Sequence, residues 1–249
     1  MKLHRELFIA GSLDDLAREA AARVVDLANR SVQMRGRFSL ALSGGSTPRR
    51  LYQLLTQSPY RQAIDWSRVH LFFADERFVP HADSESTVRL IRETLLQGVT
   101  VPDENFHVMP TESGSPEQNA ALYTRELELF FGGTVPVFDL ILLGMGPDGH
   151  TASLFPGHPD PAGIVAAVHD SPKPPPIRLT LTLTAIRAAR EVMFLVTGAD
   201  KAETLAQVFD ADINDAQALP AARVSAFDGR SSWLVDPEAA RAIRCHSSA

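Results

Sequence analysis

Residues 138–151 read Phe138-Asp139-Leu140-Ile141-Leu142-Leu143-Gly144-Met145-Gly146-Pro147-Asp148-Gly149-His150-Thr151. The first six residues are mainly apolar and predict a buried strand, and the glycines and proline after it permit a tight loop of special shape. The loop presents a carboxylate, Asp148, and an imidazole, His150, at the carboxyl end of that strand. Ligands bind at this edge in open α/β sheets. Taken alone, the motif fits a ligand site and a simple turn with a solvated Asp148 equally well.

A second junction between strand and loop lies near residue 40. Residues 38–42 predict a strand, and residues 49–55 predict a helix whose first turn suits Pro48. The segment between them offers glycines for close approach of the backbone to a ligand, together with hydroxyl and N–H donors: Ser43, Gly44, Gly45, Ser46 and Thr47. An ordinary helix cap needs only one hydroxyl, so we interpret the segment as a phosphate cradle. It matches neither Gly-x-Gly-x-x-Gly nor a Walker loop, which argues against nucleotide ligands.

A third junction joins the apolar residues 69–74 to Asp75, Glu76 and Arg77. Three consecutive ionisable residues directly after a buried strand indicate function when they accompany the other two loops. Alone, they are better explained as an exposed cluster with a local ion pair, worth under about 1 kcal/mol.

Strand and helix candidates alternate along the chain, which is typical of a mostly parallel sheet with helices on both faces. The expected strands are residues 6–9, 38–42, 69–74, 138–143, 178–183, 192–196 and 233–235, with a further short candidate at 106–109. The expected helices are a long one after Ser12 to about Met34, then 49–55, 86–96, 116–131, one capped by Asp200, and one from Pro237. We expect a single-domain open α/β sheet over residues 1–249, because no linker separates two units.

The composition restricts the partners and the compartment. The chain has 249 residues with 45% hydrophobic and 22% charged residues, a formal net charge of −6 and one cysteine, Cys245. The acidic balance argues against nucleic-acid and acidic-membrane partners. One cysteine fits a reducing cytosol, and no run approaches the roughly 18 apolar residues of a membrane helix. We expect a cytoplasmic protein without a signal peptide.

A bound phosphate needs positive charge as well as N–H donors. Arg178 follows a proline run, and Lys201 occupies the first turn of a helix, where its charge opposes the helix dipole unless an anion is present. For each of them a solvated side chain is the simpler alternative. Lys173, inside the proline run, is expected to be solvated.

In this order and spacing, four blocks resemble the 6-phosphogluconolactonase family. They are Ser43-Gly44-Gly45-Ser46-Thr47-Pro48, Asp75-Glu76-Arg77-Phe78-Val79-Pro80, residues 144–156, and Ser171-Pro172-Lys173-Pro174-Pro175-Pro176 with Arg178-Leu179-Thr180. The resemblance covers essentially the whole chain and implies a Rossmann-like sugar-phosphate deaminase/lactonase fold. It also implies a hydrolase of the oxidative pentose phosphate pathway that converts 6-phospho-D-glucono-1,5-lactone to 6-phospho-D-gluconate, without cofactor or metal.

Two related classes share the first block: glucosamine-6-phosphate deaminases and non-catalytic sugar-phosphate sensors. The deaminase pattern has a glutamate where this chain has Phe155, and phenylalanine cannot transfer a proton. A sensor does not need the Asp148 and His150 pair. One departure from the lactonase pattern is Thr87, where the family commonly has asparagine, and we interpret the preceding Ser86 as a helix N-cap.

The expected mechanism is attack of water on the lactone carbonyl. His150 is the expected general base, because imidazole titrates near neutral pH, and Asp148 either orients it or holds a sugar hydroxyl. Arg77 and loop N–H groups are expected to meet the developing oxyanion, and Asp75 to bind hydroxyls or position water. The resemblance implies which residues hold the 6-phosphate: Gly44, Gly45, Ser46, Thr47, Arg178 and Lys201. The partner is then a small sugar-phosphate lactone, and the chain is a monomer or a weak homo-oligomer.

Overall fold

The computed structural model describes residues 4–212, 215, 217–228 and 230–243. Its main feature is a six-stranded sheet in which every neighbouring pair is parallel. In spatial order the strands are β1 (His4–Ile9), β9 (Arg230–Val235), β8 (Val192–Val196), β5 (Leu140–Leu143), β2 (Phe38–Leu42) and β3 (Val69–Phe73). The predicted mostly parallel α/β sheet is confirmed.

The order of the strands creates a topological switch. The chain passes from β2 outward to β3 at one edge, then returns to β5 and continues toward the other edge with β8 and β9. The connections after β2 and β5 therefore diverge, and the loops that follow these neighbouring strands border a crevice at the carboxyl edge. Those loops begin at Ser43 and Gly144, so the topology brings the two main sequence motifs together.

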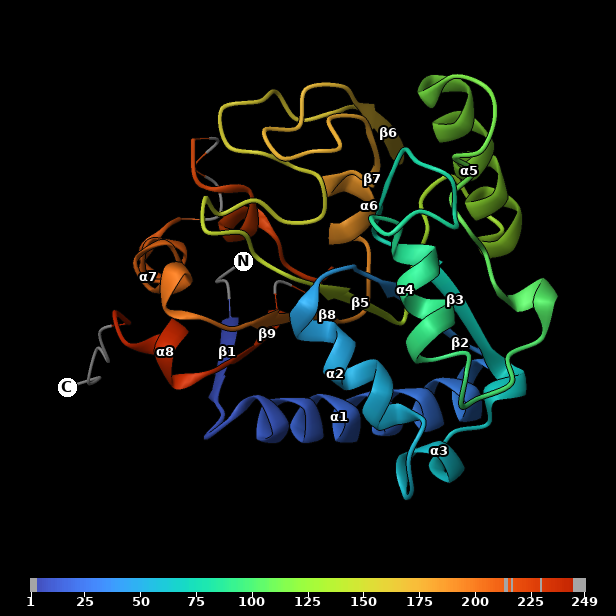
Figure 1. Cartoon of the computed structure of the whole chain (residues 1–249), viewed down its shortest axis with the longest axis horizontal. Coiled ribbons are helices and arrows are strands. Elements are labelled where there is room, and N and C mark those ends of the chain that lie inside the picture. The colour runs from blue at the N-terminus through green and yellow to red at the C-terminus, as the bar shows by residue number, and fades with distance from the viewer. Residues whose placement is uncertain (1–3, 213–214, 216, 229, 244–249) are drawn as a thin grey trace.

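Helices lie on both sides of this sheet, with α1 along one side and α5 and α6 on the other in Figure 1. The helices are α1 (Leu13–Arg35), α2 (Ser46–Leu55), α3 (Tyr60–Ala63), α4 (Thr87–Thr94), α5 (Pro116–Phe131), α6 (Leu183–Arg187), α7 (Ala202–Asp210) and α8 (Pro237–Ala240). Short 3₁₀ turns are η1 (Trp66–Arg68), η2 (Asp103–Asn105), η3 (Ala199–Lys201) and η4 (Pro220–Arg223). None of the helices in the described residues is long and apolar enough to cross a membrane.

Most predicted helix ends are confirmed by their caps. Ser12, Ser86 and Ser115 each accept a hydrogen bond from a backbone N–H in the first turn that follows. Gly36 and Gly132 end α1 and α5 in the left-handed conformation that glycine adopts readily.

A second, three-stranded sheet was not predicted. It consists of β4 (Asp75–Arg77), β7 (Arg178–Leu181) and β6 (Val165–Val168), with antiparallel pairing on both sides of β7. The alternative explanation of residues 75–77 as an exposed cluster is excluded, because their backbone pairs with β7 and the Glu76 side chain is fully buried. This sheet carries Asp75, Arg77 and Arg178 to the edge of the main sheet.

Three smaller predictions are also corrected. Residues 106–109 are not a strand, since only Phe106 forms an isolated bridge, to Leu71. The strand expected over 178–183 stops at Leu181, because Thr182 caps α6. Lys201 rather than Asp200 is the N-cap of α7, and the helix has no side-chain cap.

Buried apolar side chains from both sheets form a hydrophobic cluster that includes the fully buried Phe72, Phe194 and Trp233. Such a shared interior fixes the two sheets relative to each other. The extent of the single domain over 1–249 stays a prediction, and Cys245 lies outside the described residues.

Candidate active site

A pocket of about 290 Å³ lies at the carboxyl edge, between the loops that follow β2, β5 and β8. Most of the predicted site residues line it, together with several that were not predicted. The lining residues are Ser43, Gly44, Gly45, Ser46, Thr47, Pro48, Asp75, Arg77, Gly144, Met145, Gly146, Pro147, His150, Ala152, Lys173, Arg178, Leu195, Thr197 and Lys201.

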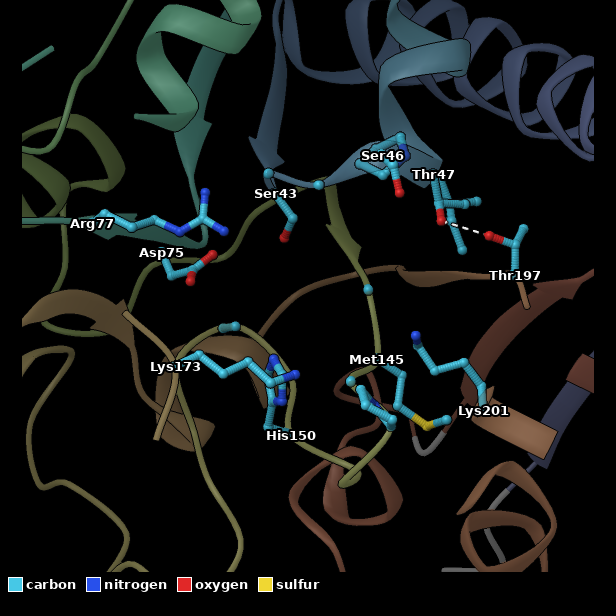
Figure 2. A pocket seen from close by; sticks show the side chains of 18 of the residues that line it. Ser43, Ser46, Thr47, Asp75, Arg77, Met145, His150, Lys173, Thr197 and Lys201 are labelled. Atoms are coloured by element: carbon cyan, nitrogen blue, oxygen red, sulfur yellow. Dashed lines mark hydrogen bonds between the residues drawn. The ribbon is translucent and has the colours of Figure 1, made fainter. Parts of the chain in front are cut away.

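The labelled side chains form two groups in Figure 2, which we call the His150 side and the Lys201 side. The His150 side contains Asp75, Arg77, Lys173 and His150, and the Lys201 side contains Thr47, Thr197 and Lys201. A molecule that occupies the pocket therefore meets an imidazole at one end and an ammonium group with hydroxyls at the other.

The loop after β2 has a backbone that only glycine suits. Gly45, the residue before α2, has φ 111°, and α2 has no side-chain cap, which rules out the simple helix-cap explanation of this loop. Gly44 serves a different purpose, because a Cβ there would lie 2.7 Å from Thr87 Oγ1 and 2.9 Å from Arg77 Nη1. Gly44 therefore leaves room for the Thr87 and Arg77 side chains. Ser46 and Thr47, at the start of α2, line the pocket, and the first N–H groups of a helix have no partner within the helix.

The hydroxyls of this loop differ in how free they are. Ser43 Oγ donates to the carbonyl of Leu142 at 2.8 Å, and Tyr52 Oη donates to the carbonyl of Ser43 at 2.7 Å. The Ser43 side chain thus links the end of β2 to β5, and its hydroxyl proton is not available to a ligand. Thr47 Oγ1 lies 2.8 Å from Thr197 Oγ1, a residue that the sequence analysis missed.

The loop after β5 holds His150 by its Nδ1 atom, which lies 2.5 Å from Asp148 Oδ1. A carboxylate only accepts, so Nδ1 carries the proton and the lone pair on Nε2 is available. Asp148 stands behind the ring and does not line the pocket. Gly146 permits this arrangement, since a Cβ there would lie 2.1 Å from the imidazole and 2.5 Å from Asp148 Oδ1.

Burial lowers the pKa of His150, and the Lys173 ammonium lowers it further, while Asp148 raises it. The net shift is downward, so the imidazole is neutral at pH 7. Burial alone raises the pKa of Asp148, but the hydrogen bonds from the His150 side chain and backbone outweigh burial and leave that pKa below its usual value. The pair is therefore a carboxylate and a neutral imidazole, which is the combination a general base requires.

Asp75 and Arg77 project from alternate positions of β4 into the pocket, with Glu76 on the opposite side. Asp75 is 7% exposed and accepts a hydrogen bond of 2.7 Å from Ser153 Oγ. Arg77 Nη1 donates to the carbonyl of Glu85 at 3.0 Å. The carboxylate and the guanidinium are thus both fixed at the pocket wall.

Lys173 lines the pocket, so the prediction that its side chain is a solvated surface group is wrong. The reason is Arg178, which is 5% exposed and whose guanidinium donates to the carbonyls of Lys173 at 3.1 Å and of Pro175 at 3.3 Å. These bonds fold the proline run back over the site. Arg178 itself is the first residue of β7 and pairs with Arg77 of β4. Its burial excludes the alternative that the Arg178 side chain is simply solvated.

Lys201 reaches the pocket from η3, and its Nζ lies 2.7 Å from Asp200 Oδ2. Phe155 packs behind His150 with the ring centroids 4.9 Å apart, and it is 4% exposed. The position that distinguishes the deaminase pattern therefore contacts the candidate base directly.

No candidate metal site occurs in the part of the chain that the structure describes, because no three His, Cys, Asp or Glu side chains there are grouped so as to hold a metal ion.

Thr197 and Lys173 show what sequence reasoning missed. Thr197 directly follows the buried strand β8. Polar residues that follow buried strands are site candidates elsewhere in the chain, and the same criterion would have identified Thr197. Lys173 offered no such signal, because its position depends on Arg178 from the next strand.

Comparisons with known proteins agree with this geometry. Residues 11–233 match the family model described as glucosamine-6-phosphate isomerases/6-phosphogluconolactonase. The 6-phosphogluconolactonase of Synechocystis is 40% identical over 232 residues, covering 92% of this chain and 94% of that protein. The rat enzyme of the same name is 45% identical over 216 residues, covering 84% and 82%.

A solved structure of 6-phosphogluconolactonase from Trypanosoma brucei superimposes with a TM-score of 0.85 at 28% identity, covering 98% of this chain and 100% of that one. The match in fold thus extends beyond the motifs to nearly the whole chain. With the family model and these relatives in agreement, the chain belongs to the glucosamine-6-phosphate isomerase/6-phosphogluconolactonase family.

Proposed function

We propose that this protein hydrolyses 6-phospho-D-glucono-1,5-lactone to 6-phospho-D-gluconate. The observation that carries the proposal is that one pocket contains a neutral imidazole held by a carboxylate and, on its other side, a glycine loop at a helix start with Lys201. The volume of about 290 Å³ suits a small phosphorylated sugar. The names of the relatives support the same substrate.

The Lys201 side is assigned to the phosphate. The backbone N–H groups of the Ser46 and Thr47 turn supply donors, and the ammonium of Lys201 supplies charge. Arg178, which is 5% exposed, adds a buried positive charge to the pocket wall beside Arg77. Holding the phosphate fixes the ring so that its C1 carbonyl lies on the His150 side, which converts the attack into a step between positioned groups.

On the His150 side, Nε2 removes a proton from water, and the oxygen of that water bonds to C1. The carbonyl oxygen becomes an oxyanion, for which Arg77 and Lys173 supply positive charge. The tetrahedral intermediate collapses by breaking the bond between C1 and the ring oxygen, and the imidazolium returns its proton to that oxygen. Asp148 keeps the imidazole in the required tautomer, and Asp75 holds a sugar hydroxyl or the attacking water.

The choice between lactonase and deaminase depends on Phe155. Its ring packs against His150 with the centroids 4.9 Å apart, and phenylalanine cannot move a proton, so the chemistry is left to His150 and water. The cytoplasmic location and the monomeric or weakly associated state expected from the sequence belong to this proposal as well.

The test is a rapid assay of 6-phosphogluconolactone opening with the purified chain, corrected for spontaneous hydrolysis. We expect acceleration that inorganic phosphate inhibits competitively, and no ammonia from glucosamine 6-phosphate. A rate equal to the spontaneous rate would refute the proposal, and release of ammonia would move the assignment to the deaminases.

A further inference from the structure

The Asp75 carboxylate is tied to the loop that carries His150. Ser153 lies three residues after His150, is 1% exposed, and its Oγ donates to Asp75 Oδ2 at 2.7 Å. Asp75 belongs to β4 in the second sheet, whereas the His150 loop follows β5 in the main sheet. This hydrogen bond therefore connects the pocket residue Asp75 on β4 to the loop that carries His150.

The backbone around Ser153 is built to present that hydroxyl. Thr151 and Leu154 form an isolated antiparallel bridge, with Leu154 N donating to the carbonyl of Thr151 at 2.9 Å. Ala152, at the tip of this turn, has φ 47° and is the one non-glycine residue with positive φ in the described part of the chain. Such a conformation is unfavourable for alanine and persists where surrounding contacts enforce it, often at functional sites.

Two more contacts fix the turn. Thr151 Oγ1 donates to the carbonyl of Gly144 at 2.8 Å, which ties the turn to the start of its own loop. Ser153 N donates to Thr180 Oγ1 at 3.1 Å, and Thr180 is the residue that pairs with Asp75 in the β4–β7 register. The backbone N–H of Ser153 thus binds Thr180 and its hydroxyl binds Asp75, and these two residues are paired in the three-stranded sheet.

We propose that Ser153 is a positioning residue that sets the Asp75 carboxylate relative to the His150 imidazole. Its hydroxyl touches no substrate, because Ser153 does not line the pocket, so it acts through Asp75. The inference rests on the proposed lactonase function and adds a residue to it.

The test is a double-mutant cycle of Ser153→Ala and Asp75→Asn. In the parent, Ser153→Ala should lower kcat about tenfold while KM and the inhibition constant of inorganic phosphate change less than about twofold. In the Asp75→Asn background, the same substitution should change kcat by less than about twofold, because the group that it positions has already been altered. Ser153→Cys, which keeps the side-chain size and a weak donor, should have a kcat between those of the parent and Ser153→Ala.

Ser39→Ala is the matched control. Ser39 Oγ donates to Asp139 Oδ2 at 2.9 Å, and both residues are buried, so the variant loses the same kind of bond away from the pocket. We expect it to leave kcat unchanged even if its melting temperature falls as far as that of Ser153→Ala.

The inference is overturned if Ser153→Ala leaves kcat unchanged, or if it lowers kcat by the same factor in both backgrounds. A parent chain without lactonase activity overturns the proposed function and this inference together. That failure is seen before any variant is made, so the two failures are distinguishable.

Discussion

A buried carboxylate lies near each end of strand β5, Asp139 at the amino end and Asp75 of β4 at the carboxyl end, and the two have different partners. Asp139, just before the strand, is 4% exposed, and its carboxylate accepts from Ser39 N at 2.8 Å, from Ser39 Oγ at 2.9 Å and from Arg35 Nε at 2.9 Å. Both carboxylate oxygens are thus bound within the protein. At the carboxyl end, Asp75 also accepts from a serine, but it faces a pocket that Arg77, Lys173 and Lys201 line as well.

The difference shows which end stabilises the fold and which end binds. At the amino end the charges are neutralised by one another, so that removing a partner costs stability. At the carboxyl end Arg77 and Lys173 line an open pocket together with Lys201, which is paired with the exposed Asp200, and this gathering of positive charge favours an anionic ligand. Substitutions at the carboxyl end should therefore change kinetics, and those at the amino end should change stability.

Asp148→Asn should have the largest effect among the following variants. Without the carboxylate the imidazole loses its enforced tautomer, and we expect kcat to fall about 10² to 10⁴-fold. Asp148 raises the pKa of His150, so its loss lowers that pKa and moves the acidic limb of the kcat/KM profile to lower pH. A pH profile with thermal melts checks both points, and an acidic limb that moves to higher pH would contradict the assigned pair.

Lys173→Met should lower kcat about 10 to 10²-fold, because one of two charges near the developing oxyanion is removed. Lys173 lowers the pKa of His150, so this variant should raise that pKa and move the acidic limb to higher pH, opposite to Asp148→Asn. Steady-state kinetics between pH 5 and 9 measure both changes. An unchanged kcat would return Lys173 to the surface role first expected of it.

Asp139→Ala tests the amino end. Loss of hydrogen bonds to a buried carboxylate should cost about 2 to 3 kcal/mol of unfolding free energy, measured by urea denaturation. Because the site lies at the other end of β5, kcat and KM at 25 °C should stay within about twofold of the parent. A kinetic defect as large as that of Lys173→Met would mean that the two ends are not independent.

Gly36→Ala should have the smallest effect. Gly36 ends α1 with φ 75° and has no atom within 4 Å of a Cβ, so the cost is conformational and about 1 kcal/mol. Gly133→Ala is the matched control, since that glycine also has open space around a Cβ but no positive φ. Equal melting temperatures for the two variants would contradict the left-handed cap as the cause.

The sequence predicted the main sheet and its functional loops because those features are local. Buried runs such as 38–42 and 138–143 end in glycine-rich loops, and a parallel sheet brings such ends to one edge. The caps at Ser86 and Ser115 were equally predictable, because each follows from a few adjacent residues.

What the sequence did not predict depends on partners distant in the chain. β4 is short and charged, yet Glu76 is fully buried because it accepts from the backbone of Thr87 at 2.8 Å and of Val88 at 2.9 Å, at the start of α4. A carboxylate is favourable at a helix start, but nothing near residue 76 in the sequence indicates that α4 will meet it. The position of Lys173 was unpredictable for the same reason, because it depends on hydrogen bonds from the Arg178 guanidinium to the carbonyls of Lys173 and Pro175.

The central claim is that one pocket anchors the phosphate on the Lys201 side and performs the chemistry on the His150 side. The most direct measurement compares His150→Ala with Lys201→Ala in the lactone assay, with inorganic phosphate as competitor. We predict that His150→Ala lowers kcat about 10² to 10⁴-fold and keeps the phosphate inhibition constant, while Lys201→Ala weakens phosphate and substrate binding and largely keeps kcat. Parental turnover in His150→Ala, or unchanged phosphate inhibition in Lys201→Ala, would contradict this division of the pocket.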